Sequence, residues 1–453
     1  MNLERFAEAL GAAEVVNPAP VEISELSFDA RTAPPGSLFF CVPGHAADGH
    51  DFATQAIANG AAALVVERPL PLGVPQLVVA GVRRAMPAAA TLFFGDPSAE
   101  LDVIGITGTN GKTTTAYLLH SILVAAGRRP GLLGNIERRV GETVLPAGLN
   151  APEAIDLQRL LRQMVDAGDD AAVIEATSHA SALGRLEGTR FAVLVFTNLT
   201  PEHLDFHGTM DEYFEAKRRL FAQAERAVVN VGDEYGRRLA DELPDAVTFD
   251  AEADELAGVV LRLRGRFNLE NAVAAAAAAR SLGIDETAIR RGLEAVTGVP
   301  GRFEEVDEGQ PFTVIVDYAH KPDALATALA AARELTRGRV VCVFGCGGDR
   351  DRTKRPVMGR IAAELADLAI VTSDNPRSED PLGIIAEIVA GAPGLEVEPD
   401  RRAAIARAID TARAGDVVVI AGKGHEQGQE IGREQLPFDD RAVVREALAG
   451  ARA

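Results

Sequence analysis

A glycine-rich segment at residues 105–114, Gly-Ile-Thr-Gly-Thr-Asn-Gly-Lys-Thr-Thr, limits what this chain can fold into more than any other feature. The apolar run from Val103 to Ile106 predicts a strand before it, and an amphipathic stretch predicts a helix after it. Glycines let backbone N–H groups approach an anion closely, and the helix N-terminus adds a positive dipole end. A lysine here can reach the β- and γ-phosphates of a nucleotide, while a following hydroxyl group can hold Mg²⁺. The segment therefore predicts a P-loop that binds ATP through Gly108, Thr109, Asn110, Gly111, Lys112, Thr113 and Thr114.

The spacing of this segment departs from the strict G-x4-G-K-[ST] form, because Ile106 stands where the first glycine belongs. Gly105 and Gly108 flank that position. A glycine-rich surface turn before a helix is the alternative interpretation. The order of strand, loop, Lys-Thr pair and helix favours the phosphate-binding interpretation.

The overall composition argues against several classes of protein. A net charge of −20 disfavours a nucleic-acid partner, which normally requires a basic face. No apolar run reaches the ~20 residues of a membrane helix, and the N-terminus lacks the pattern of a signal peptide. Three cysteines, none in a C-x-x-C pair, suggest neither a disulfide framework nor a cysteine zinc site. We therefore expect a cytoplasmic monomer that acts on small-molecule substrates, with no nucleic-acid partner and no membrane insertion.

The order of apolar runs predicts an α/β protein, and its 453 residues suffice for about three domains of ~150 residues each. Residues 1–97 alternate short strand-like runs with a helical segment, which predicts a small α/β module. Residues 98–297 repeat strand, loop and helix, which predicts a P-loop domain with a parallel sheet. Residues 298–453 resume the alternation and predict a Rossmann-like domain. Pro97-Ser98 and the Gly298 to Gly301 segment are the predicted linkers.

Polar groups gather where four strand-like runs of the last domain end. Ligands of open α/β sheets bind at the carboxyl ends of strands. Singly, each cluster is explained as well by a turn or a cap as by a site. Together, at the strand ends of one parallel sheet, they predict a single crevice. The clusters are Asp317 to His320, Gly345 to Arg350, Asp374 to Arg377 and Gly422 to Glu426.

These motifs resemble the Mur ligase family, the ATP-dependent amino-acid ligases of peptidoglycan precursor synthesis, over essentially the whole chain. Asp-Asn-Pro-Arg at residues 374–377 is the most discriminating, since it resembles the version of the family that selects meso-2,6-diaminopimelate. Lysine-adding relatives generally lack that arginine. The other matching segments are Asp29-Ala30-Arg31, Pro35-Gly36, Gly44 to Gly49, Gly108 to Thr114, Glu175 to His179, Asn198 to Asp205, Glu215 to Lys217, Gly301-Arg302, Asp317 to His320 and Gly422 to Glu426.

The resemblance implies a ligase that adds meso-2,6-diaminopimelate to UDP-N-acetylmuramoyl-L-alanyl-D-glutamate. The γ-phosphate of ATP would activate the D-glutamate carboxylate as an acyl phosphate, which the incoming amine attacks. Taken alone, Lys217 is most simply a solvated helix charge and His203 a helix cap. The resemblance instead implies that Lys217 carries a carbamate, which turns a cation into an anion. The implied catalytic residues are Lys112, Lys217, Glu175 and His203, and the implied Mg²⁺ ligands are Thr113, Glu175, His203 and Lys217.

The resemblance also implies two sets of contacts in the last part of the chain. Arg377 would bind the distal carboxylate of diaminopimelate with two parallel hydrogen bonds. With lysine as the substrate, which lacks that carboxylate, Arg377 would stay buried and unpaired. Further nucleotide contacts are implied for Asn268, Arg302, Asp317 and His320, and amino-acid contacts for Arg350, Asp374, Asn375, Pro376, Arg377, Gly422 and Glu426.

The UDP-linked substrate is where this chain departs from the family pattern. Ala30 stands where the family commonly has serine, Asn150-Ala151 replaces a Thr-Thr pair, and Leu183 replaces glutamine. The implied contacts to this substrate are Phe28, Ala30, His45, Ala46, Ala47, Asn150, Ala151, Thr177, Leu183 and Arg185.

Two alternatives remain open at this point. The added amino acid could be L-lysine or L-ornithine rather than diaminopimelate. In a different class of function, the chain could be a non-catalytic regulator that binds a nucleotide through a retained P-loop.

Overall fold

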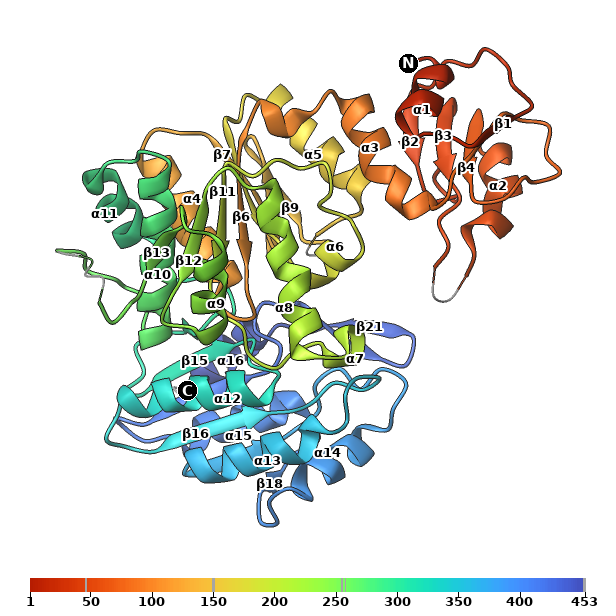
Figure 1. Ribbon diagram of the computed structural model, residues 1–453. Coiled ribbons are helices and arrows are strands. Elements are labelled where there is room, and N and C mark those ends of the chain that lie inside the picture. Colours follow the sequence, from red (N-terminus) through yellow and green to blue (C-terminus); the bar gives the residue numbers. More distant parts are fainter. Residues whose placement is uncertain (45–46, 149–150, 254–255, 257, 451–453) are drawn as a thin grey trace. The chain divides into compact units, whose positions relative to one another are not determined.

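The computed structural model describes residues 1–44, 47–148, 151–253, 256 and 258–450 (Figure 1). It divides into two compact units, of which the first comprises Met1–Asp254 with Ala274–Ile289 and the second Glu255–Val273 with Arg290–Ala453. The first unit holds two sheets, and the second holds one sheet and a separate hairpin. Within the described ranges, no helix is both long and apolar enough to cross a membrane.

The N-terminal sheet is mostly parallel and is covered on both faces. Leu38 and Phe40 pack with helices α1 (Leu3–Ala9) and α3 (Val82–Phe94), while Phe39 between them packs with α2 (Ala53–Ala58). Only β1 is antiparallel to its neighbour. The strand order is β1 (Glu14–Val16), β5 (Gln76–Val78), β4 (Ala63–Val66), β3 (Ser37–Phe40) and β2 (Glu25–Ser27).

The central sheet has eight strands, of which the six from β13 to β7 are parallel and the last two form an antiparallel hairpin. Val103 lies on one side of β6 and Ile104 and Ile106 lie on the other, and all three are fully buried, so both faces of this strand are covered. The order is β13 (Val247–Phe249), β12 (Ala227–Asn230), β11 (Val193–Phe196), β6 (Asp102–Thr107), β10 (Ala171–Glu175), β7 (Pro130–Leu133), β8 (Glu137–Val140) and β9 (Thr143–Pro146).

Helices lie on both faces of the central sheet (Figure 1). Leu157 and Leu161 of α5 (Ala154–Asp166) belong to the same apolar cluster as Val103 and Ile174 of the sheet. The Ala272–Ala279 stretch of α10 (Arg266–Ser281) is buried, as its composition predicts. The remaining helices of this part are α4 (Lys112–Ala125), α6 (Ser178–Ala182), α7 (Leu204–His207), α8 (Met210–Arg218), α9 (Glu234–Glu242) and α11 (Glu286–Ala295).

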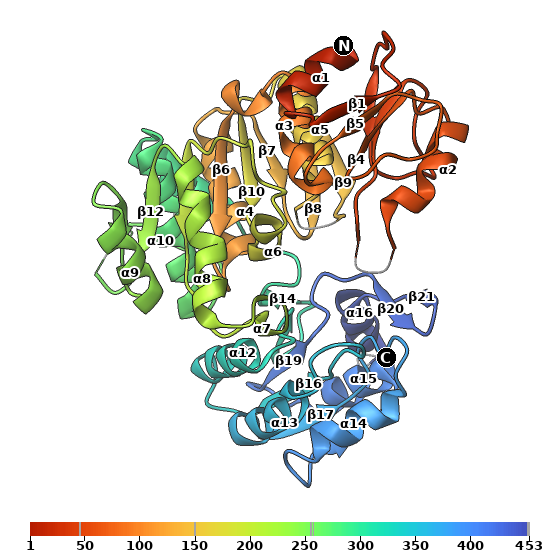
Figure 2. The same cartoon turned by 45° about the vertical axis from the view of Figure 1, so that its right-hand side comes forward.

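The C-terminal sheet is parallel apart from one short edge strand, β14. Its order is β14 (Glu304–Glu305), β15 (Thr313–Asp317), β19 (Val417–Ala421), β16 (Val340–Phe344), β17 (Leu368–Val371) and β18 (Glu396–Val397) (Figure 2). One face packs against α12 (Pro322–Glu334), α13 (Lys354–Leu365) and α14 (Pro381–Val389), and the other against α15 (Arg401–Thr411) and α16 (Asp440–Gly450). A two-stranded hairpin, β20 (Gly428–Ile431) and β21 (Glu434–Pro437), follows β19.

These sheets confirm the predicted α/β class, and two local features differ from the sequence expectations. The hairpins β8–β9 and β20–β21 were not expected, because every residue of strands β9 and β21 is exposed and these strands show no apolar alternation. Pro97 and Ser98 are buried, and Ser98 Oγ accepts a hydrogen bond from the backbone of Arg190 at 3.1 Å. This pair is therefore anchored to the first unit and is not a free linker. The domain boundaries at 97 and 297 stay a prediction.

Candidate active site

The glycine-rich loop lies between β6 and α4, with β6 placed between β11 and β10 in the sheet. Gly108 has a φ of +144°, and a Cβ there would lie 1.9 Å from Thr197 Oγ1, so the position requires glycine. Thr197 Oγ1 donates to the Asn110 carbonyl at 2.7 Å, and Asn198 Oδ1 accepts from the Asn110 N–H at 2.9 Å. The end of β11 thus holds the loop in place, with α4 beginning at Lys112 as predicted.

Two lysines converge on one carbonyl of this loop. Lys112 Nζ donates to Gly108 O at 3.0 Å and to Thr109 O at 2.7 Å, and Lys217 Nζ donates to Gly108 O at 2.8 Å. Lys217 is 1% exposed, which excludes a solvated helix charge. Burial lowers the pKa of Lys217 well below its ordinary value, and the charge of Lys112 adds to this shift. Both effects shift the equilibrium of this lysine toward the neutral amine.

The predicted metal ligands Thr113 and Glu175 are in direct contact. Thr113 Oγ1 donates to Glu175 Oε2 at 3.1 Å, and the backbone N–H of Asn135 donates to Glu175 Oε1 at 2.8 Å. Glu175 is the last residue of β10 and is 2% exposed. A buried carboxylate at the carboxyl end of a strand beside the phosphate loop is suitably placed to hold a cation.

His203 is the N-cap residue of α7, with a φ of +55° and no capping hydrogen bond from its side chain. Its Nε2 lies 2.6 Å from Glu202 Oε1. Burial lowers the pKa of His203 to about 4, and the charges of Lys112 and Lys217 add to the shift. Both lysines are therefore close enough to act electrostatically on this imidazole, which is neutral near pH 7.

An aromatic cluster that sequence reasoning missed connects these groups. The hydroxyl of Tyr213 lies 3.1 Å from Thr109 Oγ1, and Lys217 Nζ lies 4.6 Å from the centre of the Tyr213 ring. The rings of His179 and His203 are 4.4 Å apart in an edge-to-face arrangement. The i, i+4 spacing of Tyr213 and Lys217 on α8 was a sequence signal that these two side chains share a helix face.

The donor set fits Mg²⁺ in part. Thr113 and Glu175 supply hard oxygen atoms, which Mg²⁺ prefers. Lys217 as an amine offers no oxygen and would do so only as a carbamate. In the part of the chain that the structure describes, no group of three or more His, Cys, Asp and Glu side chains is arranged to hold a metal. A hydroxyl and a modified lysine are needed to complete the predicted set.

The residues expected to contact the UDP-linked substrate are only partly brought together. Arg185 Nη1 donates to the carbonyl of Ala151 at 3.3 Å, and its Nη2 lies 3.0 Å from Glu153. Thr177 is the N-cap residue of α6 and Leu183 its C-cap residue, so both flank the same short helix. In the N-terminal sheet domain, Ala30 is buried, Phe28 is half-buried and Ala47 is exposed. His45, Ala46 and Asn150 lie outside the described residues.

Three of the predicted C-terminal motifs meet at the carboxyl ends of β15 and β19. Gly301 has a φ of +64°, and a Cβ there would lie 2.1 Å from the backbone nitrogen of His425. The guanidinium of Arg302 lies 4.4 Å from the centre of the Tyr318 ring, which is itself 5.0 Å from the ring of His425. Asp317 accepts hydrogen bonds from the backbone N–H groups of Phe303 and Ala319.

Three of the four side chains assigned to the nucleotide are buried or have a shifted pKa. Burial raises the pKa of Asp317, while the positive charge of Arg302 partly offsets this shift. Burial lowers the pKa of His320 to about 4, and its Nδ1 lies 2.7 Å from Tyr318 O. Asn268 is 1% exposed and donates to the Arg264 carbonyl at 2.7 Å.

The four strand ends lie at one edge of the sheet, because β15, β19, β16 and β17 are parallel neighbours, and the single crevice there stays a prediction. Asn375 Nδ2 donates to Glu426 Oε2 at 2.8 Å, and Asn375 Oδ1 accepts from Lys423 Nζ at 2.8 Å. Lys423 is fully buried and also lies 3.3 Å from Glu426. Lys423 belongs to the predicted Gly422 to Glu426 cluster but was given no role of its own, and it fixes the orientation of both the amide and the carboxylate.

Arg377 is held in an unusual backbone conformation and already has partners. Its φ is +52°, its Nη1 donates to Gly348 O at 2.8 Å, and its Nε lies 2.6 Å from Glu430 Oε2. The expectation that this arginine stays unpaired without diaminopimelate is therefore wrong. Glu430 lies on the unexpected hairpin β20–β21, so nothing in the local sequence indicated the pair.

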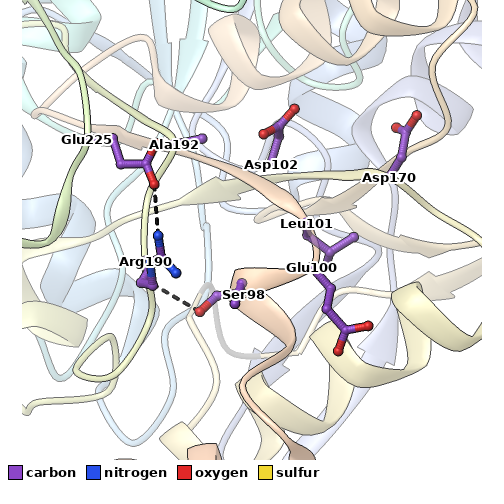
Figure 3. Close-up of a pocket in the computed structure, with 9 residues that line it drawn as sticks. Ser98, Glu100, Leu101, Asp102, Asp170, Arg190, Ala192 and Glu225 are labelled. Atoms are coloured by element: carbon purple, nitrogen blue, oxygen red, sulfur yellow. Dashed lines mark hydrogen bonds and ion pairs between the residues drawn. The ribbon is translucent and has the colours of Figure 1, made fainter.

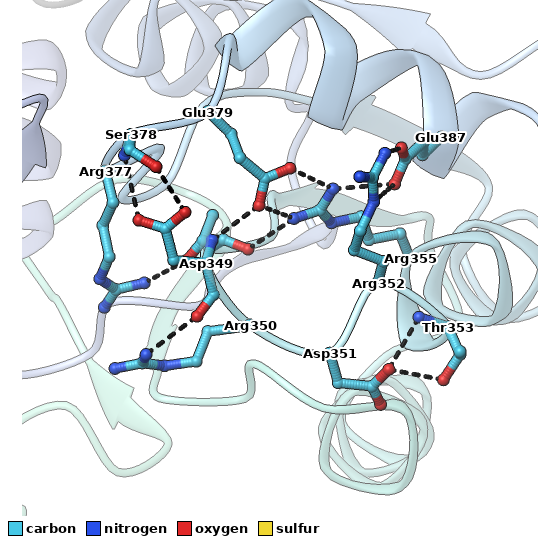
Figure 4. Close-up of polar contacts among 12 residues, drawn as sticks. Asp349, Arg350, Asp351, Arg352, Thr353, Arg355, Arg377, Ser378, Glu379 and Glu387 are labelled. Atoms are coloured by element: carbon cyan, nitrogen blue, oxygen red, sulfur yellow. Dashed lines mark hydrogen bonds and ion pairs between the residues drawn. The ribbon is translucent and has the colours of Figure 1, made fainter. Parts of the chain in front are cut away.

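A charged network holds the loop that follows β17 to the loop that follows β16 (Figure 4). The fully buried guanidinium of Arg355 bonds to Glu379 and Glu387 at 2.8–2.9 Å, and Glu379 also accepts from the Asp349 N–H at 2.6 Å. Asp349 in turn accepts from the hydroxyl of Ser378 at 2.6 Å. The predicted residues Arg350 and Arg377 are carried by these two connected loops.

The two loops approach each other so closely that one position requires glycine. A Cβ at Gly348 would lie 1.9 Å from the carbonyl oxygen of Pro376. A Cβ at Gly422 would similarly lie 2.5 Å from Asp374 Oδ2. That carboxylate oxygen is buried and has no hydrogen-bond partner among the described residues. It is a polar atom that a bound substrate or water could satisfy.

A polar cavity of about 220 Å³ lies at the opposite ends of the central strands (Figure 3). Arg190 pairs there with Glu225 at 3.0 Å, and Asp102 and Asp170 lie at the N-terminal ends of β6 and β10. None of the predicted site residues lines this cavity. The residues predicted to form the site therefore lie elsewhere.

Three stretches of the chain match domains of one family. Residues 22–104 match the Mur ligase family catalytic domain, residues 106–257 the Mur ligase middle domain, and residues 301–424 the Mur ligase glutamate ligase domain.

Individual proteins match over nearly the whole chain. The chain is 46% identical to a UDP-N-acetylmuramoyl-L-alanyl-D-glutamate--2,6-diaminopimelate ligase of Solibacter usitatus, over 95% of this chain and 94% of that protein. It is 45% identical to a protein of the same name from Streptomyces coelicolor, over 98% and 96% of the two chains. A solved structure of a ligase with this name shares 33% identity and a TM-score of 0.65, over 95% of this chain and 96% of that chain.

Proposed function

We propose that this chain, which belongs to the Mur ligase family, joins meso-2,6-diaminopimelate to UDP-N-acetylmuramoyl-L-alanyl-D-glutamate with hydrolysis of ATP to ADP and phosphate. The observation that carries this proposal is the 45–46% identity, over at least 95% of the chain, to ligases whose names state these substrates. The Asp-Asn-Pro-Arg loop at the carboxyl end of β17 supports the choice of amino acid.

The reaction needs an activated carboxylate. An oxygen of the D-glutamate carboxylate attacks the γ-phosphorus of ATP, the bond to the β-phosphate oxygen breaks, and ADP leaves. The amine nitrogen then attacks the acyl carbon, phosphate leaves, and the amine gives up a proton. Neither step requires a nucleophilic side chain, so positioning and charge neutralisation account for the catalysis.

The phosphate loop supplies much of this neutralisation. We assign Lys112 and the backbone N–H groups of residues 108–114 to the phosphates of ATP. The position of Lys112 supports this assignment, because Lys112 is the first residue of α4 and its Nζ donates to Gly108 O, which places a positive charge beside the loop at the N-terminus of the helix. On the family resemblance, we assign Asn268, Arg302, Asp317 and His320 to the nucleotide as well.

We further propose that Lys217 carries a carbamate and that Mg²⁺ is held by Thr113, Glu175, His203 and this carbamate. The neutral amine reacts with CO₂, forming an N–C bond and releasing one proton, and the burial of Lys217 favours that neutral form. Bound Mg²⁺ would neutralise charge on the transferring phosphoryl group. The carbamate nitrogen keeps one N–H, with which it can still donate to the Gly108 carbonyl.

We assign recognition of the two other substrates to separate sets of residues. Glu426 would pair with an ammonium group of the amino acid, since Lys423 and Asn375 engage only its Oε2. Arg377 would pair with the distal carboxylate. Arg350, Asp374, Pro376 and Gly422 complete this amino-acid site, while Phe28, Ala30, Ala47, Ala151, Thr177, Leu183 and Arg185, with His45, Ala46 and Asn150, are assigned to the UDP-linked substrate.

Phosphate release from the purified protein tests this proposal. With ATP, Mg²⁺ and UDP-muramoyl-dipeptide, release should depend on an added diamino acid and be fastest with meso-2,6-diaminopimelate. Faster release with L-lysine or L-ornithine would change the assigned amino acid but not the reaction. Absence of amino-acid-dependent release with all three would favour a nucleotide-binding regulator.

A further inference from the structure

Arg377 and Glu430 form an ion pair whose geometry is fixed by backbone hydrogen bonds between the two residues and their neighbours. Arg377 N donates to Glu430 O at 3.0 Å, and Gly432 N donates to Arg377 O at 2.7 Å. These backbone bonds make a β-bridge between the loop after β17 and strand β20. They fix the two residues in register, so that the Nε of Arg377 meets Glu430 Oε2 at 2.6 Å.

The hairpin is tied to the same loop by further hydrogen bonds. Gln429 Nε2 donates to the Asp374 carbonyl at 2.6 Å, and the backbone N–H of Glu430 donates to Asn375 Oδ1 at 3.1 Å. Strand β20 is therefore one wall of the proposed amino-acid site. Glu430 is the residue of this wall whose charge faces the guanidinium.

Two of the guanidinium N–H groups of Arg377 are already engaged, which limits how it can bind a substrate carboxylate. A carboxylate that binds with two parallel hydrogen bonds needs either Nε with one Nη or both Nη groups. Glu430 occupies Nε, and the Gly348 carbonyl uses a hydrogen of Nη1. The side chain of Glu430 is 46% exposed, whereas that of Arg377 is 23% exposed. Glu430 can therefore turn toward water when another carboxylate arrives, while Arg377 stays in place.

We propose that Glu430 is a resident carboxylate that pairs with Arg377 in the free enzyme and yields this position to the distal carboxylate of the amino-acid substrate. This inference rests on the proposed function, in which Arg377 binds that carboxylate. Substrate binding exchanges one carboxylate for another, and the net gain is smaller than a new ion pair. A diamino acid without a distal carboxylate leaves the Arg377–Glu430 pair intact. Lysine then binds more weakly because it gains no ion pair with Arg377, and not because it leaves the arginine unpaired.

This exchange predicts the direction in which Glu430→Gln should change the KM for diaminopimelate. Glu430→Gln keeps the size of the side chain and removes its charge, so Arg377 becomes more available to diaminopimelate. Exposed ion pairs are weak, and the KM for diaminopimelate should fall about threefold. The KM for lysine should stay the same or rise, because an uncompensated guanidinium repels its ammonium group. The kcat with diaminopimelate should change little.

The experiment compares wild-type enzyme, Glu430→Gln, Arg377→Ala and the double variant, with KM and kcat measured for both amino acids. Glu434→Gln, an exposed carboxylate on the other strand of the same hairpin, is the matched control and should behave like the wild type. In the Arg377→Ala background, Glu430→Gln should no longer change the KM for diaminopimelate. Thermal unfolding of each variant checks that the hairpin stays folded.

Three results would overturn the inference. A higher KM for diaminopimelate in Glu430→Gln would mean that Glu430 binds the substrate directly, and an unchanged KM would mean that it does not compete for Arg377. The same shift in the Arg377→Ala background would also overturn it, because the effect would not pass through the pair. A wild-type enzyme that ignores diaminopimelate, or an Arg377→Ala variant with unchanged selectivity, would instead identify failure of the proposed function, and the inference would fail with it.

Discussion

Replacing Lys217 by methionine separates a chemical role of this residue from a structural one. The substitution keeps the length of the side chain and removes the amine, which is 1% exposed and donates to Gly108 O. One such hydrogen bond contributes about 1 kcal/mol. Gly108 O still accepts from Lys112 at 3.0 Å, and a methionine sulfur can pack on the Tyr213 ring. We expect a stability change within about 1 kcal/mol, or a shift of the unfolding temperature of ~2–4 °C.

The effect on catalysis should be far larger. Removing one preorganised group that stabilises transition-state charge lowers kcat by about 10²–10³-fold, which corresponds to ~3–4 kcal/mol. The assays are amino-acid-dependent phosphate release and thermal unfolding of the same preparation. Arg218→Met is the matched control, because Arg218 is the next residue on α8 and lies in an exposed pair with Glu242. The control should keep its activity.

Three results would refute this reasoning. Lys217→Met with activity within tenfold of wild type would mean that neither the amine nor a carbamate is needed. An unfolding temperature lowered by ten degrees or more would indicate a structural role. The chain has five lysines, so ¹³C spectra with labelled bicarbonate can identify a carbamate signal that disappears in Lys217→Met. Wild-type enzyme that is active without any such signal would contradict the modification.

Three further predictions follow from the described contacts. Lys112→Ala should remain folded and lose about 10²-fold or more in turnover, and near-normal turnover would rule out the phosphate-binding loop. Arg377→Ala should lower the ratio of kcat/KM for diaminopimelate to kcat/KM for lysine by about 10–10²-fold, because the pair with Glu430 already offsets part of the gain from binding the substrate carboxylate. Equal losses with both amino acids would refute selection by this arginine. Asp440→Asn should destabilise the C-terminal unit by about 3–5 kcal/mol in urea unfolding, because both side chains of the Arg401–Asp440 pair are fully buried; a loss under ~1 kcal/mol would show that Arg401 finds another partner.

The parts of this fold that could be predicted from sequence are those with a strong local pattern. The runs 340–344, 368–371 and 417–421 are continuous apolar segments, and they coincide with the buried strands β16, β17 and β19. Parallel pairing then places the polar residues after them at one edge of the sheet. This is why the Asp374 to Arg377 cluster was correctly expected beside Gly422 to Glu426.

The contacts that could not be predicted depend on long-range pairing. The burial of Lys217 follows from the packing of α8 against the phosphate loop, and a Glu-Ala-Lys-Arg-Arg sequence on a helix gives no sign of it. The partner of Arg377 lies 53 positions further along the chain, on a hairpin whose strand β21 is polar and exposed. The contact between Arg355 and Glu379 similarly joins helix α13 to the loop that follows β17. Such pairs are fixed by tertiary structure and not by local propensity.

A competition experiment tests whether this chain is an ATP-dependent ligase whose Arg377-bearing site selects meso-2,6-diaminopimelate. The enzyme is given UDP-muramoyl-dipeptide, ATP, Mg²⁺ and equal concentrations of meso-2,6-diaminopimelate, L-lysine and L-ornithine, and the UDP-linked products are identified by mass spectrometry. We expect the diaminopimelate tripeptide to be the dominant product and to form only when ATP is present. A dominant lysine or ornithine product, or no tripeptide at all, would contradict this expectation.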